Sequence, residues 1–244
     1  KKDDLFRIYS MSKPITTVAL MMLYEKGEFQ LKDPITKFLP EFSSLYVTNE
    51  NGDKIPTDKM ITMQHLMMHA GGFSYEGANG RAALHSSKNL EEYAVRAAKS
   101  SLKYEPGTYF HYSFSTDLIG LVIQRISKIP LDVFLTENIF TPLDMNDTFF
   151  SVPDEKDSRF LPNHIWSSEE DKLVIYSCKG KPDFCSRKNV SLFLGGAGLV
   201  STAMDYMRFA EMLRNGGSLD GKRILSPKTI ELMTGDHLAA LNIS

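Results

Sequence analysis

The chain has 244 residues, of which 42% are hydrophobic, and its formal net charge at pH 7 is −2. This length is enough to bury a sizeable core in one domain, or in a domain with an inserted subdomain. The nearly balanced charge gives no electrostatic reason to expect a nucleic acid or an anionic membrane surface as a partner.

The first predicted elements are the end of a strand at residues 5–9 and an apolar helix at residues 14–24 that stops near Gly27. Even when it is counted from Met11, this apolar stretch is shorter than the roughly 20 residues that a transmembrane helix needs. It also contains Lys13. The sequence therefore predicts no transmembrane segment.

Ser10 lies at this strand-to-helix junction, and Lys13 follows three residues later. The start of the helix places the serine at the positive end of the helix dipole. The lysine, one turn on, lies on the same face. Apolar neighbours would disfavour its charged form, so the amine could take the proton of a nucleophilic serine. A serine that only caps the helix is the alternative.

Two other pairs of residues have spacings typical of catalytic or metal-binding sites. His65 and His69 have the i,i+4 spacing of metal ligands on a helix, but no glutamate occupies the key position and two glycines end that helix at once. We predict no metal site there. Ser100 and Lys103 repeat the Ser-x-x-Lys spacing without an apolar helix behind them, and we expect Ser100 to lie at a solvated helix end.

Residues 106–113 form a predicted turn and a short aromatic segment ahead of a helix at residues 116–127. Ser113 or Ser115 is expected to cap this helix. Tyr112 then projects from a loop at a helix N-terminus, where positive potential favours the phenolate and suits a general base. A packed loop aromatic is the alternative interpretation of this tyrosine.

Residues 151–190 are predicted to be irregular and charged. They contain the two cysteines, Cys178 and Cys185, whose spacing is compatible with a disulfide or with two free thiols. Thr202 is then predicted to cap a helix at residues 203–214. The apolar residues of this helix are expected to pack in the core: Met204, Met207, Phe209, Ala210, Met212 and Leu213.

Five segments follow one another along the chain and together carry a family resemblance: residues 6–15, 27–34 with 38–42, 62–72, 112–120 and 195–202. With these segments the chain resembles the serine β-lactamase-like superfamily, which includes the class C β-lactamases and the penicillin-binding proteins. It is most similar to the esterase branch, the family VIII carboxylesterases. The resemblance implies an α/β fold of the β-lactamase/transpeptidase type, an α+β sandwich in which helices flank an antiparallel sheet, plus a mainly helical subdomain. It also implies one catalytic domain over residues 1–244, with structural roles for His65 and His69.

The chain departs from the family pattern in two places. The β-lactamases and peptidases of the superfamily carry an asparagine two residues after the tyrosine, where this chain has Phe114. A phenyl ring cannot hold a substrate amide, so we predict that Phe114 contacts the substrate and favours esters over peptides and β-lactams. The third motif of the family, which supplies the second oxyanion donor, is expected after residue 244, and further strands are expected ahead of Ser10.

The resemblance therefore implies a serine hydrolase that cleaves small acyl esters through an acyl-enzyme, with Ser10 as the nucleophile and Lys13 with Tyr112 as its base. A β-lactamase or D-alanyl-D-alanine peptidase is the alternative within this fold, and a catalytically silent homologue is the alternative without catalysis. The expected partner is a small-molecule ester, and no cofactor or metal is implied. The oligomeric state stays open, as does the choice between a cytoplasmic and an exported protein.

Overall fold

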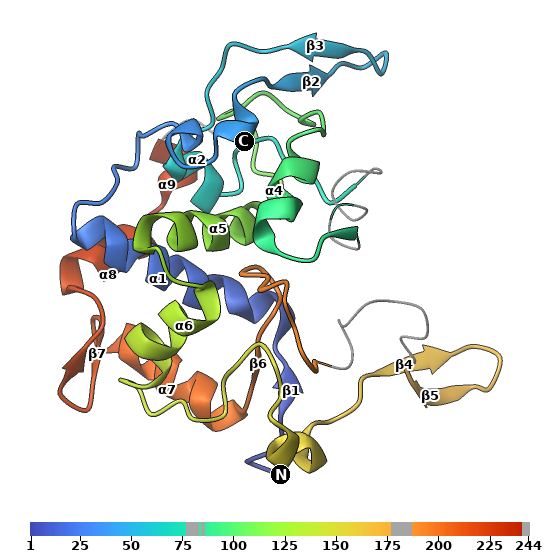
Figure 1. Cartoon of the computed structure of the whole chain (residues 1–244), viewed down its shortest axis with the longest axis vertical. Coiled ribbons are helices and arrows are strands. Elements are labelled where there is room, and N and C mark those ends of the chain that lie inside the picture. Colours follow the sequence, from blue (N-terminus) through green and yellow to red (C-terminus); the bar gives the residue numbers. More distant parts are fainter. Residues whose placement is uncertain (77–82, 84–85, 177–186, 241–244) are drawn as a thin grey trace.

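The computed structural model describes residues 1–76, 83, 86–176 and 187–240. Two long helices, α1 (Ser12–Glu25) and α5 (Ser115–Ser127), pack against each other near the centre of the molecule (Figure 1). Shorter helices lie around this pair (Figure 1). They are α2 (Met63–Met67), α4 (Leu90–Ala97), α6 (Leu131–Leu135), α7 (Ala203–Arg214), α8 (Pro227–Thr234) and α9 (His237–Ala240).

Helix α1 forms where the sequence predicts a helix, and it ends as predicted. Its apolar residues are buried on several sides because neighbouring helices cover it, and Ile15, Val18 and Ala19 are completely inaccessible to solvent. At its end, Gly27 takes a φ of +77°, and its N–H binds the Tyr24 carbonyl at 2.9 Å. A glycine adopts this left-handed conformation at little cost, which makes it a common helix terminator.

Helix α5 is buried at every residue from Ser115 to Ile123, because it lies between α1 and the helices on its other side. The prediction that Ser113 or Ser115 caps it is wrong. Phe114 occupies the cap position without a side-chain hydrogen bond, and the hydroxyls of Ser113 and Ser115 lie 2.8 Å from each other. Both serines are buried, and this hydrogen bond gives each hydroxyl a partner away from water.

A short antiparallel ladder leads into α1. Strand β1 (Phe6–Arg7) pairs with β6 (Val200–Ser201), with Arg7 opposite Val200. Phe149 forms a further antiparallel bridge with Val200, and the Ile8 N–H continues the ladder to the Leu199 carbonyl at 3.1 Å. The predicted strand end at residues 5–9 is therefore confirmed, and the ladder joins the first residues of the chain to residues near 200.

The other strands of the described residues form three hairpins, two of which extend from the body of the molecule (Figure 1). The hairpin of β4 and β5 falls within the segment predicted to be irregular, as does a 3₁₀ helix at Asp154–Arg159. The prediction missed this hairpin because it has no buried face, and Trp166 is 60% exposed. Cys178 and Cys185 lie outside the described residues. The strand pairs are β2 (Tyr46–Thr48) with β3 (Lys54–Pro56), β4 (His164–Ser167) with β5 (Lys172–Ile175), and β7 (Ser218–Leu219) with β8 (Lys222–Arg223).

Helix α7 has the predicted boundaries, and Thr202 caps it by accepting the Asp205 N–H at 3.1 Å. The prediction that Met204 and Met207 pack in the core is wrong, because these side chains are 55% and 62% exposed. The prediction is confirmed for Phe209 and Met212, which are buried, whereas Ala210 is exposed and Leu213 is half-buried. Among the described residues, no helix is long and apolar enough to span a bilayer.

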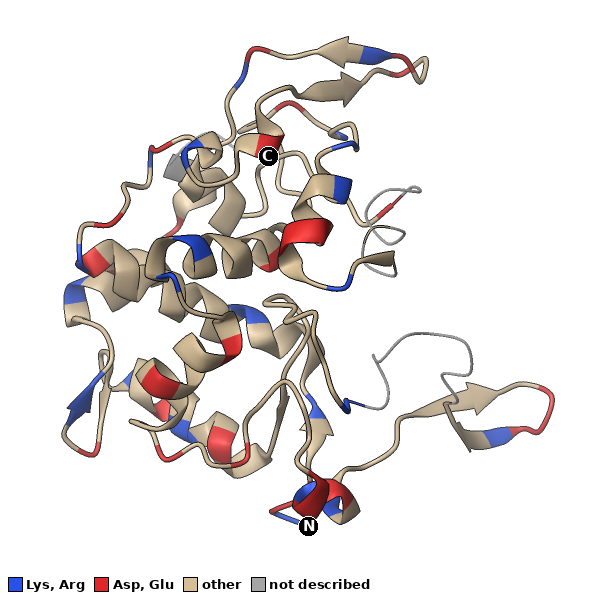
Figure 2. Cartoon of the chain, in the orientation of Figure 1, with Lys and Arg blue, Asp and Glu red and all other residues tan. Residues whose placement is uncertain are grey.

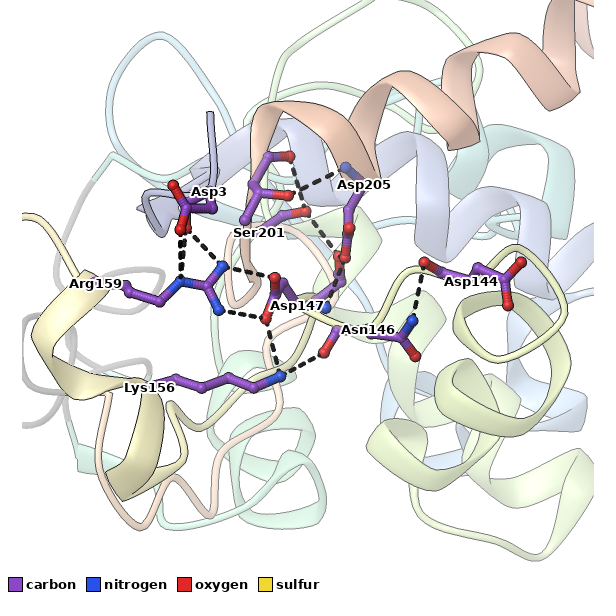
Figure 3. Close-up of polar contacts among 10 residues, drawn as sticks. Asp3, Asp144, Asn146, Asp147, Lys156, Arg159, Ser201 and Asp205 are labelled. Carbon is purple, nitrogen blue, oxygen red and sulfur yellow. Dashed lines mark hydrogen bonds and ion pairs between the residues drawn. The ribbon is translucent and has the colours of Figure 1, made fainter. Parts of the chain in front are cut away.

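A polar network holds the N-terminal end of the molecule together (Figure 3). Asp147 accepts hydrogen bonds from Arg159, and this ion pair holds the pKa of the Asp147 carboxyl below its usual value. Arg159 also donates to the main-chain oxygen of Asp3 at 2.6 Å. Asp205, at the start of α7, accepts the Asp147 N–H at 2.8 Å and the Thr148 hydroxyl at 2.9 Å. The network therefore fixes the segments on both sides of the ladder.

Candidate active site

Ser10 lies in the 3₁₀ turn Tyr9–Met11, between the end of β1 and the first turn of α1. Tyr9 has a φ of +43°, a left-handed conformation that is strained for a residue with a side chain. Beneath this turn, the buried hydroxyl of Ser12 accepts the Leu199 N–H at 3.2 Å. The ladder and this hydrogen bond hold the turn in place, and Ser10 is exposed on it.

Lys13 lies in the first turn of α1, and its Nζ is 3.4 Å from Ser10 Oγ. The same Nζ donates a shorter hydrogen bond of 2.8 Å to the Gly196 carbonyl. It also lies 4.6 Å from the centre of the Tyr112 ring. The helical spacing therefore places the amine beside the serine, and a distant carbonyl fixes its direction.

Tyr112 reaches the same serine hydroxyl from the loop before α5. Its phenolic O–H donates to Ser10 Oγ at 2.6 Å. The two residues are 102 positions apart in the sequence, and the packing of α5 on α1 brings them together. Ser10, Lys13 and Tyr112, which the sequence analysis singled out separately, therefore converge on one oxygen atom.

The ring of His69 packs against the ring of Tyr112. The centres of the two rings are 4.9 Å apart, and His69 Nδ1 accepts the Ser113 N–H at 3.2 Å. Burial, and then the positive charge of Lys13, lower the pKa of His69 to about 4. The ring is therefore neutral near pH 7 and remains an acceptor. The i,i+4 spacing of His65 and His69 does not predict this contact, because Tyr112 and Ser113 lie in a loop more than 40 residues further along the chain.

The segment Gly195–Gly196, which binds Lys13, is itself held by hydrogen bonds to α1 and α5. The Gly196 N–H donates to Asp117 Oδ1 at 2.7 Å, and Thr16 Oγ1 donates to the Gly195 carbonyl at 2.8 Å. A Cβ atom on Gly196 would lie 2.9 Å from Asp117 Oδ1, which is too close for an alanine. Asp117 was not singled out from the sequence, because a single acidic residue in the first turn of a helix is common.

Phe114 does not lie beside Ser10. Its ring is 1% exposed and packs against the rings of Phe73, Tyr75 and Tyr93, with centre-to-centre distances of 5.0, 6.2 and 5.8 Å. A substrate could reach this ring only by displacing core side chains. The sequence-based prediction that Phe114 contacts the substrate stays a prediction, and this burial counts against it.

The other two pairs singled out from the sequence have local roles. Lys103 pairs with Glu76 at 2.6 Å rather than with Ser100, whose hydroxyl is buried without a hydrogen-bond partner among the described residues. The prediction that Ser100 is solvated is therefore wrong. His65 Nδ1 accepts the Thr62 N–H at 3.4 Å and completes a capping box on α2. In the part of the chain that the structure describes, no group of three or more His, Cys, Asp or Glu side chains could hold a metal ion.

The described residues also line an apolar cavity that includes Met21, Met68 and Met233. Ser10, Lys13 and Tyr112 are not among its lining residues. Its lining includes the hydroxyl of Thr17 and the ring of His237, but both ring nitrogens of His237 contact other groups, Gln64 Nε2 at 3.4 Å and the Leu232 carbonyl at 2.6 Å. The hydrogen-bonded cluster around Ser10 is the better candidate for chemistry.

Comparisons with known proteins find a matching family model and several similar proteins. The family model described as Beta-lactamase matches residues 1–242. Protein Rv1367c of Mycobacterium tuberculosis is 32% identical over 253 aligned residues, which cover 98% of this chain and 61% of that protein. Esterase EstB of Burkholderia gladioli is 28% identical, over 88% of this chain and 58% of the esterase. The chain thus spans about three fifths of the length of these relatives.

Among solved structures, one similar chain is EstCE1, described as a hydrolase with promiscuous acyltransferase activity. The TM-score is 0.76 at 25% sequence identity, and the match covers 96% of this chain and 64% of EstCE1.

Proposed function

Because the chain belongs to the Beta-lactamase family, we propose that it is a serine hydrolase that cleaves small acyl esters through a covalent acyl-enzyme. The observation that carries this proposal is the approach of Tyr112 Oη, at 2.6 Å, and Lys13 Nζ, at 3.4 Å, to Ser10 Oγ. A hydroxyl beside groups that can take its proton is what nucleophilic catalysis requires. Since residues as distant as 10 and 196 build the site, we also propose that residues 1–244 form one catalytic domain.

In the proposed reaction, Ser10 Oγ attacks the ester carbonyl while its proton passes to the base formed by Tyr112 and Lys13. The tetrahedral intermediate expels the alcohol, which leaves with that proton, and the acyl group stays on Ser10. Water then attacks the acyl-enzyme and gives a proton to the same base, which returns it to Ser10 as the acid leaves. We assign the Ser10 N–H as one oxyanion donor, a contact whose loss typically costs about 2.7–4 kcal/mol.

The surroundings of Ser10 support an ester with apolar groups as the substrate. Tyr9 and Met11 flank the serine, and their side chains are 37% and 47% exposed. An apolar surface of this kind favours an alkyl group over a charged or amide-bearing one. The names of EstB and EstCE1 describe an esterase and a hydrolase, which supports the same substrate class for this chain.

The first test concerns the nucleophile. Ser10→Ala should abolish labelling by a fluorophosphonate probe and hydrolysis of p-nitrophenyl butyrate, because the attacking oxygen is removed. Its circular dichroism spectrum should stay unchanged, since the side chain is exposed. Ser100→Ala is the matched control from the other Ser-x-x-Lys pair and should keep full activity. Activity that survives in Ser10→Ala would refute the proposal, and a wild-type protein that no probe labels would identify a silent homologue.

The second test separates an esterase from a β-lactamase or a D-alanyl-D-alanine peptidase. We expect kcat/KM for p-nitrophenyl butyrate to exceed kcat/KM for nitrocefin, because the exposed side chains that flank Ser10, Tyr9 and Met11, favour an alkyl group over an amide-bearing one. A protein that prefers nitrocefin would overturn the ester assignment while leaving Ser10 as the nucleophile.

A further inference from the structure

The main chain of Gly196 is held by a hydrogen bond on each side of its Cα atom. Its carbonyl accepts a hydrogen bond from Lys13 Nζ at 2.8 Å, and its N–H donates to Asp117 Oδ1 at 2.7 Å. The carboxylate of Asp117, the main chain of Gly196 and the Lys13 amine therefore form one row of hydrogen-bonded groups. This row leads to Ser10 Oγ, 3.4 Å from the amine.

The groups in this row are closely packed. Asp117 is 2% exposed and lies in the first turn of α5, so its carboxylate is enclosed by protein and has little room to move. A Cβ atom on Gly195 would lie 2.7 Å from the Thr116 carbonyl, and one on Gly196 would lie 2.9 Å from Asp117 Oδ1. The close packing means that the position of Asp117 determines where the Gly196 carbonyl points.

We propose that Asp117 is a positioning residue of the catalytic site, whose buried carboxylate fixes the main chain at Gly196 so that the Gly196 carbonyl holds the Lys13 amine beside Ser10. This inference rests on the proposed function. Asp117 touches neither Ser10 nor a substrate, and it acts only through Gly196 and Lys13.

The charge of Asp117 gives this arrangement a pH dependence. Burial raises the pKa of Asp117 to about 6, although the Gly196 N–H and the charge of Lys13 favour the ionised form. The other titratable groups that face it are Tyr75 and Tyr93, and its charge adds to the burial that raises their pKa values. Both tyrosines are therefore neutral where Asp117 titrates. Below about pH 6 the carboxyl gains a proton and becomes a weaker acceptor for Gly196.

The experiment compares Asp117→Asn and Asp117→Ala in the full chain, with p-nitrophenyl butyrate as substrate. Both variants should lower kcat roughly 10- to 100-fold, the factor that corresponds to losing a hydrogen bond to a charged group. KM should change less than about twofold, because Asp117 makes no contact with the substrate and its loss removes none of the substrate-binding interactions. The wild-type protein should gain activity as the pH rises through about 6, and this step should be missing in Asp117→Asn.

Asp205→Asn is the matched control. Asp205 is also the third residue of its helix, is 7% exposed and accepts a main-chain N–H, from Asp147, but its partners belong to the network of Figure 3. This variant should lose stability in urea and keep the wild-type pH profile. A destabilised fold alone would therefore not reproduce the effect expected of Asp117.

The proposal is overturned if Asp117→Asn keeps the wild-type kcat and pH profile, or if the wild-type profile is flat between pH 5 and 7. The second outcome needs no variant, so it decides the matter even if Asp117→Ala does not fold. A Ser10→Ala protein that remains active would instead refute the proposed function. The two failures are thus distinguishable.

Discussion

The hydroxyl of Ser10 has two polar neighbours, and different parts of the fold hold them. Lys13 is directed by the Gly196 carbonyl. Tyr112 is supported by the ring of His69, which is tied to the next residue of the loop, Ser113. The proposed base thus consists of two side chains that are anchored separately, and both contact Ser10 Oγ.

This arrangement predicts how mutations of the base combine. Lys13→Ala and Tyr112→Phe should each lower kcat about 10²- to 10⁴-fold, the usual contribution of general acid–base catalysis. The double variant should be little worse than either single one, because residues that act as a unit give non-additive losses. Single-turnover rates with p-nitrophenyl butyrate measure this directly. Losses that multiply in the double variant would show that the two side chains act independently.

At the scale of the elements, the loop before α5 carries Tyr112 outward and Phe114 inward. Phe114 is buried among three aromatic rings, so an amide in its place would lose the ring contacts and leave its polar atoms without water. We expect Phe114→Asn to lower the free energy of unfolding by at least the roughly 3–5 kcal/mol typical of a buried Phe→Ala change. Urea titration measures this loss.

Phe110→Asn is the control for this prediction, because Phe110 lies on the same loop and is 47% exposed. It should change the free energy of unfolding by less than about 0.5 kcal/mol. If Phe114→Asn left stability intact and raised nitrocefin turnover relative to ester turnover, the ring would contact the substrate, as the sequence analysis predicted.

The elements that the sequence predicted well are those whose pattern is local. The apolar periodicity of α1 and the Thr202 cap of α7 gave these helices nearly correct boundaries. The hairpin of β4 and β5 was missed because neither of its faces is buried. His69 and Asp117 were missed as contacts of the site because their partners, Tyr112 and Gly196, are distant in the sequence. No local pattern encodes which loop packs on which helix.

At the scale of the whole molecule, the predicted fold class is confirmed. Solved structures such as EstCE1 align with this chain at a TM-score of 0.76, and the described strand pairs are antiparallel. The fold of the β-lactamase/transpeptidase type could be inferred from the sequence because its motifs occur in order along the chain. In Figure 2, positions of Lys and Arg and positions of Asp and Glu are interspersed along the ribbon, in keeping with the nearly balanced net charge.

The hydrogen bond between Lys13 and Gly196 also has a consequence for folding. It closes a loop of 183 residues, and the bond between Tyr112 and Ser10 closes one of 102. Closing such loops costs entropy before any contact offsets it, whereas a helix forms in about a microsecond from neighbours alone. A chain of this length commonly passes through partly folded intermediates. During refolding from urea, helical circular dichroism should therefore recover before ester hydrolysis does. Recovery of both signals at one rate would mean that the long-range closures form together with the helices.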